Sequence, residues 1–133
     1  MPYLQLDLPG SYPAPTKKKL AHRLGELYAE VMQTTPSMVN VGFGELGEGN
    51  LYRCGPAEPE AAAVIHCDIR RGRPAEQRLA FAQRLVDECV QLLGLRAELV
   101  AVEFTQHSAE EMYRNGSWGR EWTPSEHPTH SEA

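Results

Sequence analysis

The beginning of the chain holds a group that could act as a base. Methionine is normally removed when the next residue is small, so we expect Pro2 to carry a free secondary amine. An α-amino group titrates at about pH 8, and burial or nearby cations would lower its pKa. The amine would then be neutral at physiological pH, which suits a general base. The alternative is that Pro2 only opens a strand, a position that proline tolerates.

A group of three arginines could bind an anion. Arg70, Arg71 and Arg73 stand directly before a predicted helix, where the helix dipole makes cations locally unfavourable. A small carboxylate held between the guanidinium groups and the free N–H groups of the helix start would relieve this repulsion. We therefore predict that this basic turn, Arg71 included, binds a substrate carboxylate. The alternative is a solvated basic turn.

An internal repeat indicates which elements position these groups. Residues 39–43 (VNVGF) reappear as residues 100–104 (VAVEF), a shift of 61 residues. The same shift relates the LYRCG and MYRNG segments, which begin at Leu51 and Met112. One constant offset at separated places indicates a duplicated unit. We assign residues 1–122 to one domain, with units of about 1–60 and 61–122, and residues 123–133 to a polar tail.

Each unit begins with a strand and continues with a helix. Residues 4–8 alternate apolar and polar side chains, and residues 62–69 form a short apolar run, so both are predicted strands. Residues 16–33 and 75–93 repeat apolar side chains at helical spacing, and Gly94 is placed to end the second helix. A strand containing V-x-V-x-F follows each helix. The predicted buried stripe of the second helix is Leu79, Ala82, Leu85, Val86, Cys89, Leu92 and Leu93.

These elements predict the fold class and the relative positions of the candidate groups. A strand, helix and strand with a long crossover form a βαβ unit with parallel strands. Tandem βαβ units predict an α+β fold, a four-stranded mixed sheet with two helices on one face. If the first strands of the units pair antiparallel, Pro2 lies beside Ile69 and Arg70 and shares a pocket with the anion site. Tyr3 and Val64 are expected on the uncovered face, and a half-covered sheet with apolar residues on both faces favours an oligomer.

Composition counts against several classes of protein. The chain has 133 residues, 41% of them apolar, and a net charge of −5, which suit one globular domain and disfavour nucleic acid binding. No apolar run reaches the length of a membrane helix. Three widely spaced cysteines fit neither a disulfide framework nor a metal site. We predict a cytoplasmic protein that needs no metal or cofactor. Trp118 and Trp122 predict that their segment packs on something, a neighbouring subunit being one candidate.

The pattern as a whole resembles a known family. A Met-Pro start, tandem βαβ units and the IRRGRP segment at residues 69–74 resemble the tautomerase superfamily, and within it the branch of cis-3-chloroacrylic acid dehalogenase. The resemblance extends to about Trp122. It implies a homotrimer in which a proline amine does the chemistry and two arginines bind a substrate carboxylate. The positions that match these groups are Pro2, Arg70 and Arg73.

Three further positions of the dehalogenase branch differ in this chain. Where that branch has a histidine, a tyrosine and a glutamate, this sequence holds approximately Ala29, Glu103 and Arg114. These departures count against water activation, and so against dehalogenation. Glu103 is still predicted to contact the substrate, because its strand equivalent does so in the dehalogenases; a solvated or interface glutamate is the alternative. Arg114 is a candidate anion contact, or it shares a structural role with its repeat partner Arg53.

The resemblance and the residues together favour a tautomerase. We expect proton movement in a small enol or unsaturated carboxylic acid, with Pro2 as general base. One alternative is a hydratase, dehalogenase or decarboxylase in which Pro2 acts as general acid. Another is a non-catalytic oligomeric binding module.

Overall fold

The computed structural model describes residues 2–124, which form two βαβ units in sequence. The elements of the first unit are β1 (Tyr3–Leu8), α1 (Ala14–Met32), the 3₁₀ turn η1 (Pro36–Met38) and β2 (Asn40–Glu45). A hairpin of β3 (Tyr52–Arg53) and β4 (Glu60–Ala61) connects the units. The elements of the second unit are β5 (Ala63–Arg70), α2 (Ala75–Leu93), η2 (Ala97–Leu99) and β6 (Val100–His107). The last described elements are η3 (Ala109–Glu111), β7 (Tyr113–Arg114) and β8 (Ser117–Trp118).

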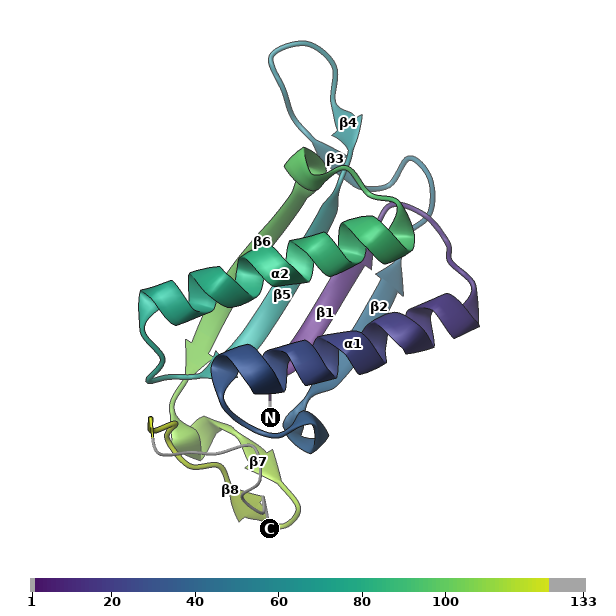
Figure 1. The fold of residues 1–133 in the computed structure, drawn as a ribbon. Coiled ribbons are helices and arrows are strands. Elements are labelled where there is room, and N and C mark those ends of the chain that lie inside the picture. The colour runs from purple at the N-terminus through teal and green to yellow at the C-terminus, as the bar shows by residue number, and fades with distance from the viewer. Residues whose placement is uncertain (1, 125–133) are drawn as a thin grey trace.

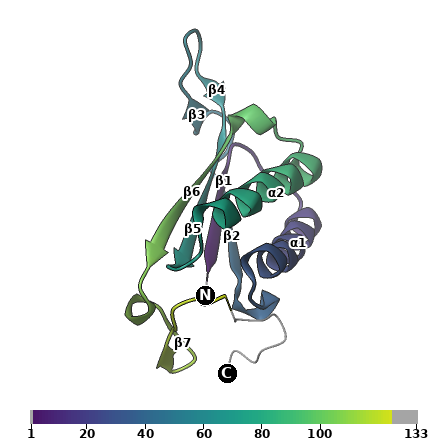
Figure 2. The same ribbon diagram turned by 60° about the vertical axis from the view of Figure 1, so that its left-hand side comes forward.

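The four long strands form one mixed sheet in the order β2-β1-β5-β6. β1 and β2 are parallel, β5 and β6 are parallel, and β1 pairs antiparallel with β5 at the centre. Both helices lie on the same face of this sheet, as Figure 1 and the turned view in Figure 2 show. The fold class predicted from the repeat is confirmed. The short strands β3 and β7 also occupy the repeated Tyr-Arg positions.

The helix boundaries follow from proline and glycine. α1 begins two residues earlier than predicted, because Pro13 serves as its N-cap and Pro15 lies in the first turn, where a missing N–H costs nothing. α2 has the predicted bounds. It ends at Gly94, whose φ of 70° is left-handed and whose N–H donates to the Val90 carbonyl over 3.0 Å.

The core lies between the sheet and the helices. Alternate residues of β1 and β5 point toward the helices, as the period of two requires. Fully buried core side chains include Leu4, Leu6, Leu8, Leu20, Leu24, Met32, Ile65, Cys67, Ile69, Phe81 and Leu85.

The buried stripe of α2 differs from the predicted one. Leu79 is 58% exposed, whereas Phe81 is fully buried and meets the Tyr28 ring of α1 edge to face, with 5.0 Å between ring centroids. The stripe runs in steps of four from Phe81 through Leu85 and Cys89. Leu79 lies two positions before Phe81 and so falls on another side of the helix. The prediction for Leu79 is therefore wrong.

Phe81 is a good test of this packing. Phe81→Ala would leave a cavity between the helices and is expected to destabilise the fold by about 3–5 kcal/mol. Urea denaturation followed by circular dichroism measures the change. Leu79→Ala is the matched control on the same helix, with an expected change of about 0.5 kcal/mol or less. Equal losses in the two variants would contradict the assignment of the core.

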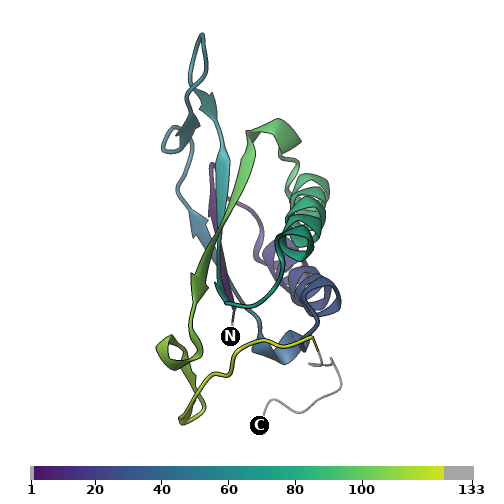
Figure 3. The same ribbon diagram turned by 90° about the vertical axis from the view of Figure 1, so that its left-hand side faces the viewer.

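The face of the sheet away from the helices is mainly polar, contrary to the expectation of apolar residues on both faces. Tyr3 and Val64 do lie on this face, but most of their neighbours are charged or polar. His66 lies between two carboxylates, with Nε2 3.3 Å from Asp7 and Nδ1 2.9 Å from Glu103. Figure 3 shows that no helix covers this side of the sheet.

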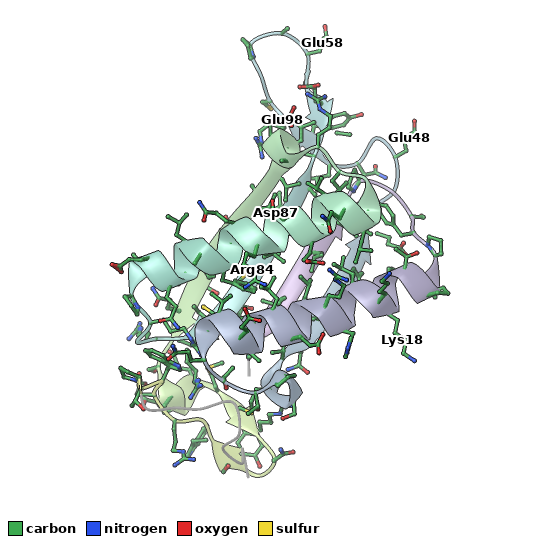
Figure 4. The ribbon with its side chains drawn as sticks, viewed as in Figure 1. Lys18, Glu48, Glu58, Arg84, Asp87 and Glu98 are labelled. Atoms are coloured by element: carbon green, nitrogen blue, oxygen red, sulfur yellow. The ribbon has the colours of Figure 1, made fainter. Side chains whose placement is uncertain are left out.

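The outer surface of the helices is charged. Lys18 lies on the outer side of α1, and Arg84 and Asp87 lie on the outer side of α2 (Figure 4). Glu48 and Glu58 lie at the end of the sheet opposite to the start of β1 (Figure 4). Of the helices that the structure describes, none is long and apolar enough to cross a membrane.

Candidate active site

Pro2 is buried directly before the central strand β1. Its carbonyl accepts hydrogen bonds from the backbone N–H of Asn40 over 3.0 Å and from the Asn40 side chain over 3.4 Å. Tyr3 pairs with Asp68 in the antiparallel register, so Pro2 stands one step further, opposite Ile69. The pairing therefore brings Pro2 to the end of β5, next to Arg70.

The arginines occupy the turn between β5 and α2. Arg70 is the last residue of β5 and is 8% exposed, Arg71 is exposed, and Arg73 is 3% exposed. Gly72 makes the turn possible with a φ of 123°, a conformation that L side chains rarely adopt. Pro74 then caps α2. Arg70 and Arg73 are thus both buried, at the end of the strand that pairs with β1.

Arg73 is held at the end of α1. Its Nε donates to the Met32 carbonyl over 2.8 Å, and this carbonyl belongs to the negative end of the helix dipole. The guanidinium carbon also lies 5.5 Å from the centroid of the Tyr28 ring and 5.1 Å from that of Trp122. A cation between two aromatic faces is stabilised by both ring quadrupoles. These contacts explain how a charged side chain is buried here.

Arg70 contacts a segment near the end of the described chain. Its Nη1 donates to the Arg120 carbonyl over 2.7 Å. We call residues Gly119–Trp122 the strap. The strap is anchored at Gly119, whose N–H donates to the Met112 carbonyl over 2.7 Å, and at Trp122, whose Nε1 donates to the Gln33 carbonyl over 3.2 Å. Trp122 therefore packs within its own chain. Trp118, in contrast, is 65% exposed and contacts Tyr113 of the same hairpin.

A cavity of about 530 Å³ opens on the uncovered side of the sheet, at the end where β1 begins. Tyr3 and Asn40 connect it to Pro2, because one follows Pro2 in sequence and the other holds its carbonyl. The residues that line the cavity are Tyr3, Asn40, Asp68, His107, Glu111 and Met112. None of these six residues is among the site residues predicted from the sequence. Asn40 reaches the cavity because β2 pairs with β1, and Glu111 reaches it because η3 folds back after β6.

Glu111 is an ionised carboxylate at this cavity. The N–H of Ser108 and then its hydroxyl donate to Oε1 over 3.0 and 2.9 Å, and these bonds lower the pKa of Glu111. Positive charge on His107 and Arg71 lowers the pKa further. A carboxylate of this kind can accept a hydrogen bond from water or substrate.

Two other predicted site residues have partners within the chain. Glu103 is on the uncovered face of β6 and pairs across the sheet with His66, which in turn pairs with Gln5. Gln5 lies three residues along β1 from Pro2, a distance of about 10 Å. Its carboxylate pairs with His66. Arg114 donates to the carbonyls of Ser37 and Met38 over 2.6 and 2.8 Å, so it fastens β7 to η1.

Metal-ligating side chains and cysteine thiols are the other groups that could do chemistry. Among residues 2–124, no group of three or more histidine, cysteine, aspartate or glutamate side chains could hold a metal ion. The three cysteines are unpaired. Burial raises the pKa of both Cys67 and Cys89 to about 12, so these thiols stay protonated and unreactive.

The similarity of this chain to known proteins is found by comparing structures. No protein-family model matches the chain, and no curated protein matches it significantly. A solved member of the cis-3-chloroacrylic acid dehalogenase family matches with a TM-score of 0.80 and 25% identity, over 90% of this chain and 84% of that one.

Two further structures have the same fold at lower identity. A wild-type fused 4-OT, solved as an asymmetric trimer, has a TM-score of 0.77 and 20% identity, over 87% of this chain and 94% of that one. A macrophage migration inhibitory factor-like protein from Entamoeba histolytica has a TM-score of 0.72 and 15% identity, over 88% and 97%.

Proposed function

Because this chain belongs by its fold to the tautomerase superfamily, we propose that it is an enzyme that moves a proton within a small enol or unsaturated carboxylic acid. The Pro2 amine, released when Met1 is removed, acts as the general base. Arg70 and Arg73 bind the substrate carboxylate, and no cofactor takes part. The observation that supports this most is the antiparallel register, which sets Pro2 opposite Ile69 and beside the buried Arg70.

The proposed reaction transfers one proton and needs no oxidant. The Pro2 nitrogen accepts the proton of the enol hydroxyl, and the electron pair of the O–H bond forms the carbonyl. The carbon–carbon double bond shifts its electrons to carbon, which then takes the proton from the Pro2 ammonium group. The guanidinium groups stabilise the negative charge that develops on the oxygen. A buried site strengthens that stabilisation because little water screens it.

The proposal includes an oligomer. A fused 4-OT with this fold forms a trimer, and we propose a homotrimer in the cytoplasm for this chain as well. Its uncovered sheet face and the edge strands β2 and β6 are available for contacts between subunits. Sedimentation equilibrium measures the assembly, and a monomer at micromolar concentration would contradict it.

The test of the activity is an assay with an enol acid. Phenylenolpyruvate has the required enol and carboxylate, and its conversion to the keto form is followed by ultraviolet absorbance. We expect the purified protein to accelerate this conversion well above the rate in buffer. Intact mass spectrometry of the same sample determines whether Met1 has been removed. A protein that lacks Met1 and does not accelerate conversion of any enol or unsaturated acid in a panel would contradict the proposal.

The dependence of the rate on pH reports the role of Pro2. A base works only in its neutral form, so kcat/KM should fall about tenfold for each pH unit below the pKa of the amine and level off above it. Arginine charge and burial both disfavour the ammonium form, so the inflection should lie below about 8. A rate that instead falls as pH rises through neutrality would show that Pro2 acts as an acid.

Addition of water to an unsaturated acid is a second candidate function, and Glu111 is the observation in its favour. Glu111 places an ionised carboxylate at the cavity beside Tyr3, where it could polarise a water molecule. Pro2 would then be the general acid. Incubation with propynoate and product analysis by NMR tests it. Formation of a hydrated product, with a rate that falls at high pH, would favour hydration over tautomerisation.

A further inference from the structure

The strap packs against the turn between β5 and α2, which carries Arg70 and Arg73 and is called the arginine turn below. Figure 3 shows the chain after β8 passing beneath the end of the sheet, from the uncovered face toward the helix side. Along this path the strap contacts the cavity residue Met112 at Gly119, the guanidinium of Arg70 at Arg120 and the guanidinium of Arg73 at Trp122. One short segment therefore contacts both arginines.

Trp122 determines how the Arg73 guanidinium is held. Tyr28 of α1 and Trp122 of the strap both contact this group, with ring centroids 5.5 and 5.1 Å from the guanidinium carbon. The Trp122 indole is itself fixed, because its Nε1 donates to the Gln33 carbonyl and the residue is only 7% exposed. Contact with both rings, together with the bond from Nε to the Met32 carbonyl, restricts the rotation of this guanidinium group.

The arginine turn is also fitted to the strap backbone. A Cβ atom on Gly72 would lie 2.9 Å from the Trp122 carbonyl oxygen, a distance that real Cβ atoms essentially never show. The Trp122 carbonyl oxygen thus occupies space that a side chain at position 72 would need, so only glycine fits there without a shift. Movement of the strap would change the position of Arg73 and of the turn that carries Arg70.

From these contacts we infer that Trp122 is a positioning residue for the carboxylate site, acting through Arg73. The inference rests on the proposed function in taking Arg70 and Arg73 as the groups that bind a substrate carboxylate. A pre-oriented guanidinium binds a carboxylate with less loss of entropy than a mobile one. Trp122 therefore raises the affinity for short unsaturated carboxylates and has little effect on proton transfer.

Ligand binding can be tested without turnover. Crotonate is a short unsaturated carboxylate, and crotonamide is its neutral counterpart of the same shape. Trp118→Phe leaves Trp122 as the sole tryptophan and keeps an aromatic ring beside Tyr113. Crotonate should change the emission of Trp122 in a saturable way, and crotonamide should not. Equal responses to both, or none to crotonate, would overturn the inference.

Two variants separate positioning from folding. Trp122→Phe keeps an aromatic face over Arg73, and Trp122→Leu keeps apolar bulk without the face. By calorimetry, we expect Trp122→Leu to raise the Kd for crotonate about tenfold, which corresponds to about 1.4 kcal/mol. Trp122→Phe should stay within about threefold of wild type. Wild-type affinity in Trp122→Leu, or no recovery in Trp122→Phe at equal thermal stability, would overturn the inference.

Gly72→Ala removes no aromatic ring and no guanidinium group, and instead moves the strap that carries Trp122. The added methyl group displaces the strap, so crotonate affinity should fall as in Trp122→Leu. Gly94→Ala is the matched control, since Gly94 also has positive φ but a Cβ atom added there would meet no atom within 4 Å. Equal crotonate affinity in the two glycine variants would count against the strap.

Kinetics with an enol acid distinguish this inference from the proposed function. In an active enzyme, Trp122→Leu should raise KM about tenfold and leave kcat within about twofold. A protein that binds crotonate through Trp122 and turns over no enol acid would remove the proposed tautomerase and keep the carboxylate site. A protein whose Trp122→Leu variant loses only kcat would remove the positioning role and keep the tautomerase.

Discussion

A protein whose Pro2 nitrogen is blocked is expected to lose about 10³-fold or more in kcat/KM for an enol acid, since general base catalysis contributes about 10²–10⁴. An N-terminal extension that cannot be cleaved turns the secondary amine into an amide, which has no basic lone pair. The measurement is the initial rate with phenylenolpyruvate, with intact mass confirming the extension. The same extension at the C-terminus is the control and should leave the rate unchanged. Full activity in the N-terminally extended protein would contradict catalysis by Pro2.

Pro2→Ala complements the extension. Alanine also permits removal of Met1, so this variant keeps a primary amine at the same place and loses the rigid ring that aims the nitrogen. An intermediate rate, between those of wild type and the extended protein, is expected. Crotonate binding should survive in both variants, because it depends on the arginines. Loss of binding together with the rate would show that the N-terminus shapes the carboxylate site itself.

Arg70→Gln is expected to lower kcat/KM by about 100- to 1,000-fold, because a charge-assisted bond to a buried anion contributes several kcal/mol. Glutamine is shorter than arginine and also gives up the bond from Nη1 to the Arg120 carbonyl, so thermal stability is measured alongside the kinetics. Most of the loss should appear in KM if the carboxylate is bound equally in the ground state and the transition state. Arg84→Gln, on the outer surface of α2, is the control and should leave the kinetics unchanged.

The substrate's own charge offers a second comparison for Arg70. Wild type should prefer an enol acid to its methyl ester strongly, and Arg70→Gln should lose most of this preference. A variant that keeps the preference would place the carboxylate elsewhere, for example at the exposed Arg71.

The sequence was sufficient for the fold because local patterns and the repeat agreed. Alternation in residues 4–8, helical spacing in residues 75–93 and the 61-residue shift all lead to the observed mixed sheet. Where the apolar spacing allowed more than one buried stripe, the packing of the helices determined which side chains are buried. Leu79 and Phe81 are both apolar, and only the meeting with Tyr28 determines that Phe81 is the buried one.

The candidate site was predictable only in part. Pro2 and Arg70 could be brought together in advance, since an antiparallel pair of first strands places one at the beginning and the other at the end. The strap could not, because the contact between Trp122 and Arg73 depends on the path of the chain after β8. Glu111 likewise reaches the cavity through the fold of η3, which no periodicity in the sequence specifies.

The antiparallel pairing of β1 with β5 relates the two halves by an approximate rotation, yet their ends are chemically unequal. The counterpart of Pro2 is Ala63, whose nitrogen is an ordinary peptide amide inside the chain and whose side chain is 1% exposed. The counterparts of Arg70 and Arg73 are Pro9 and Tyr12, neither of which is a cation. The position related by the repeat to the Pro2 site therefore lacks a counterpart of the proposed base and of both proposed carboxylate-binding arginines.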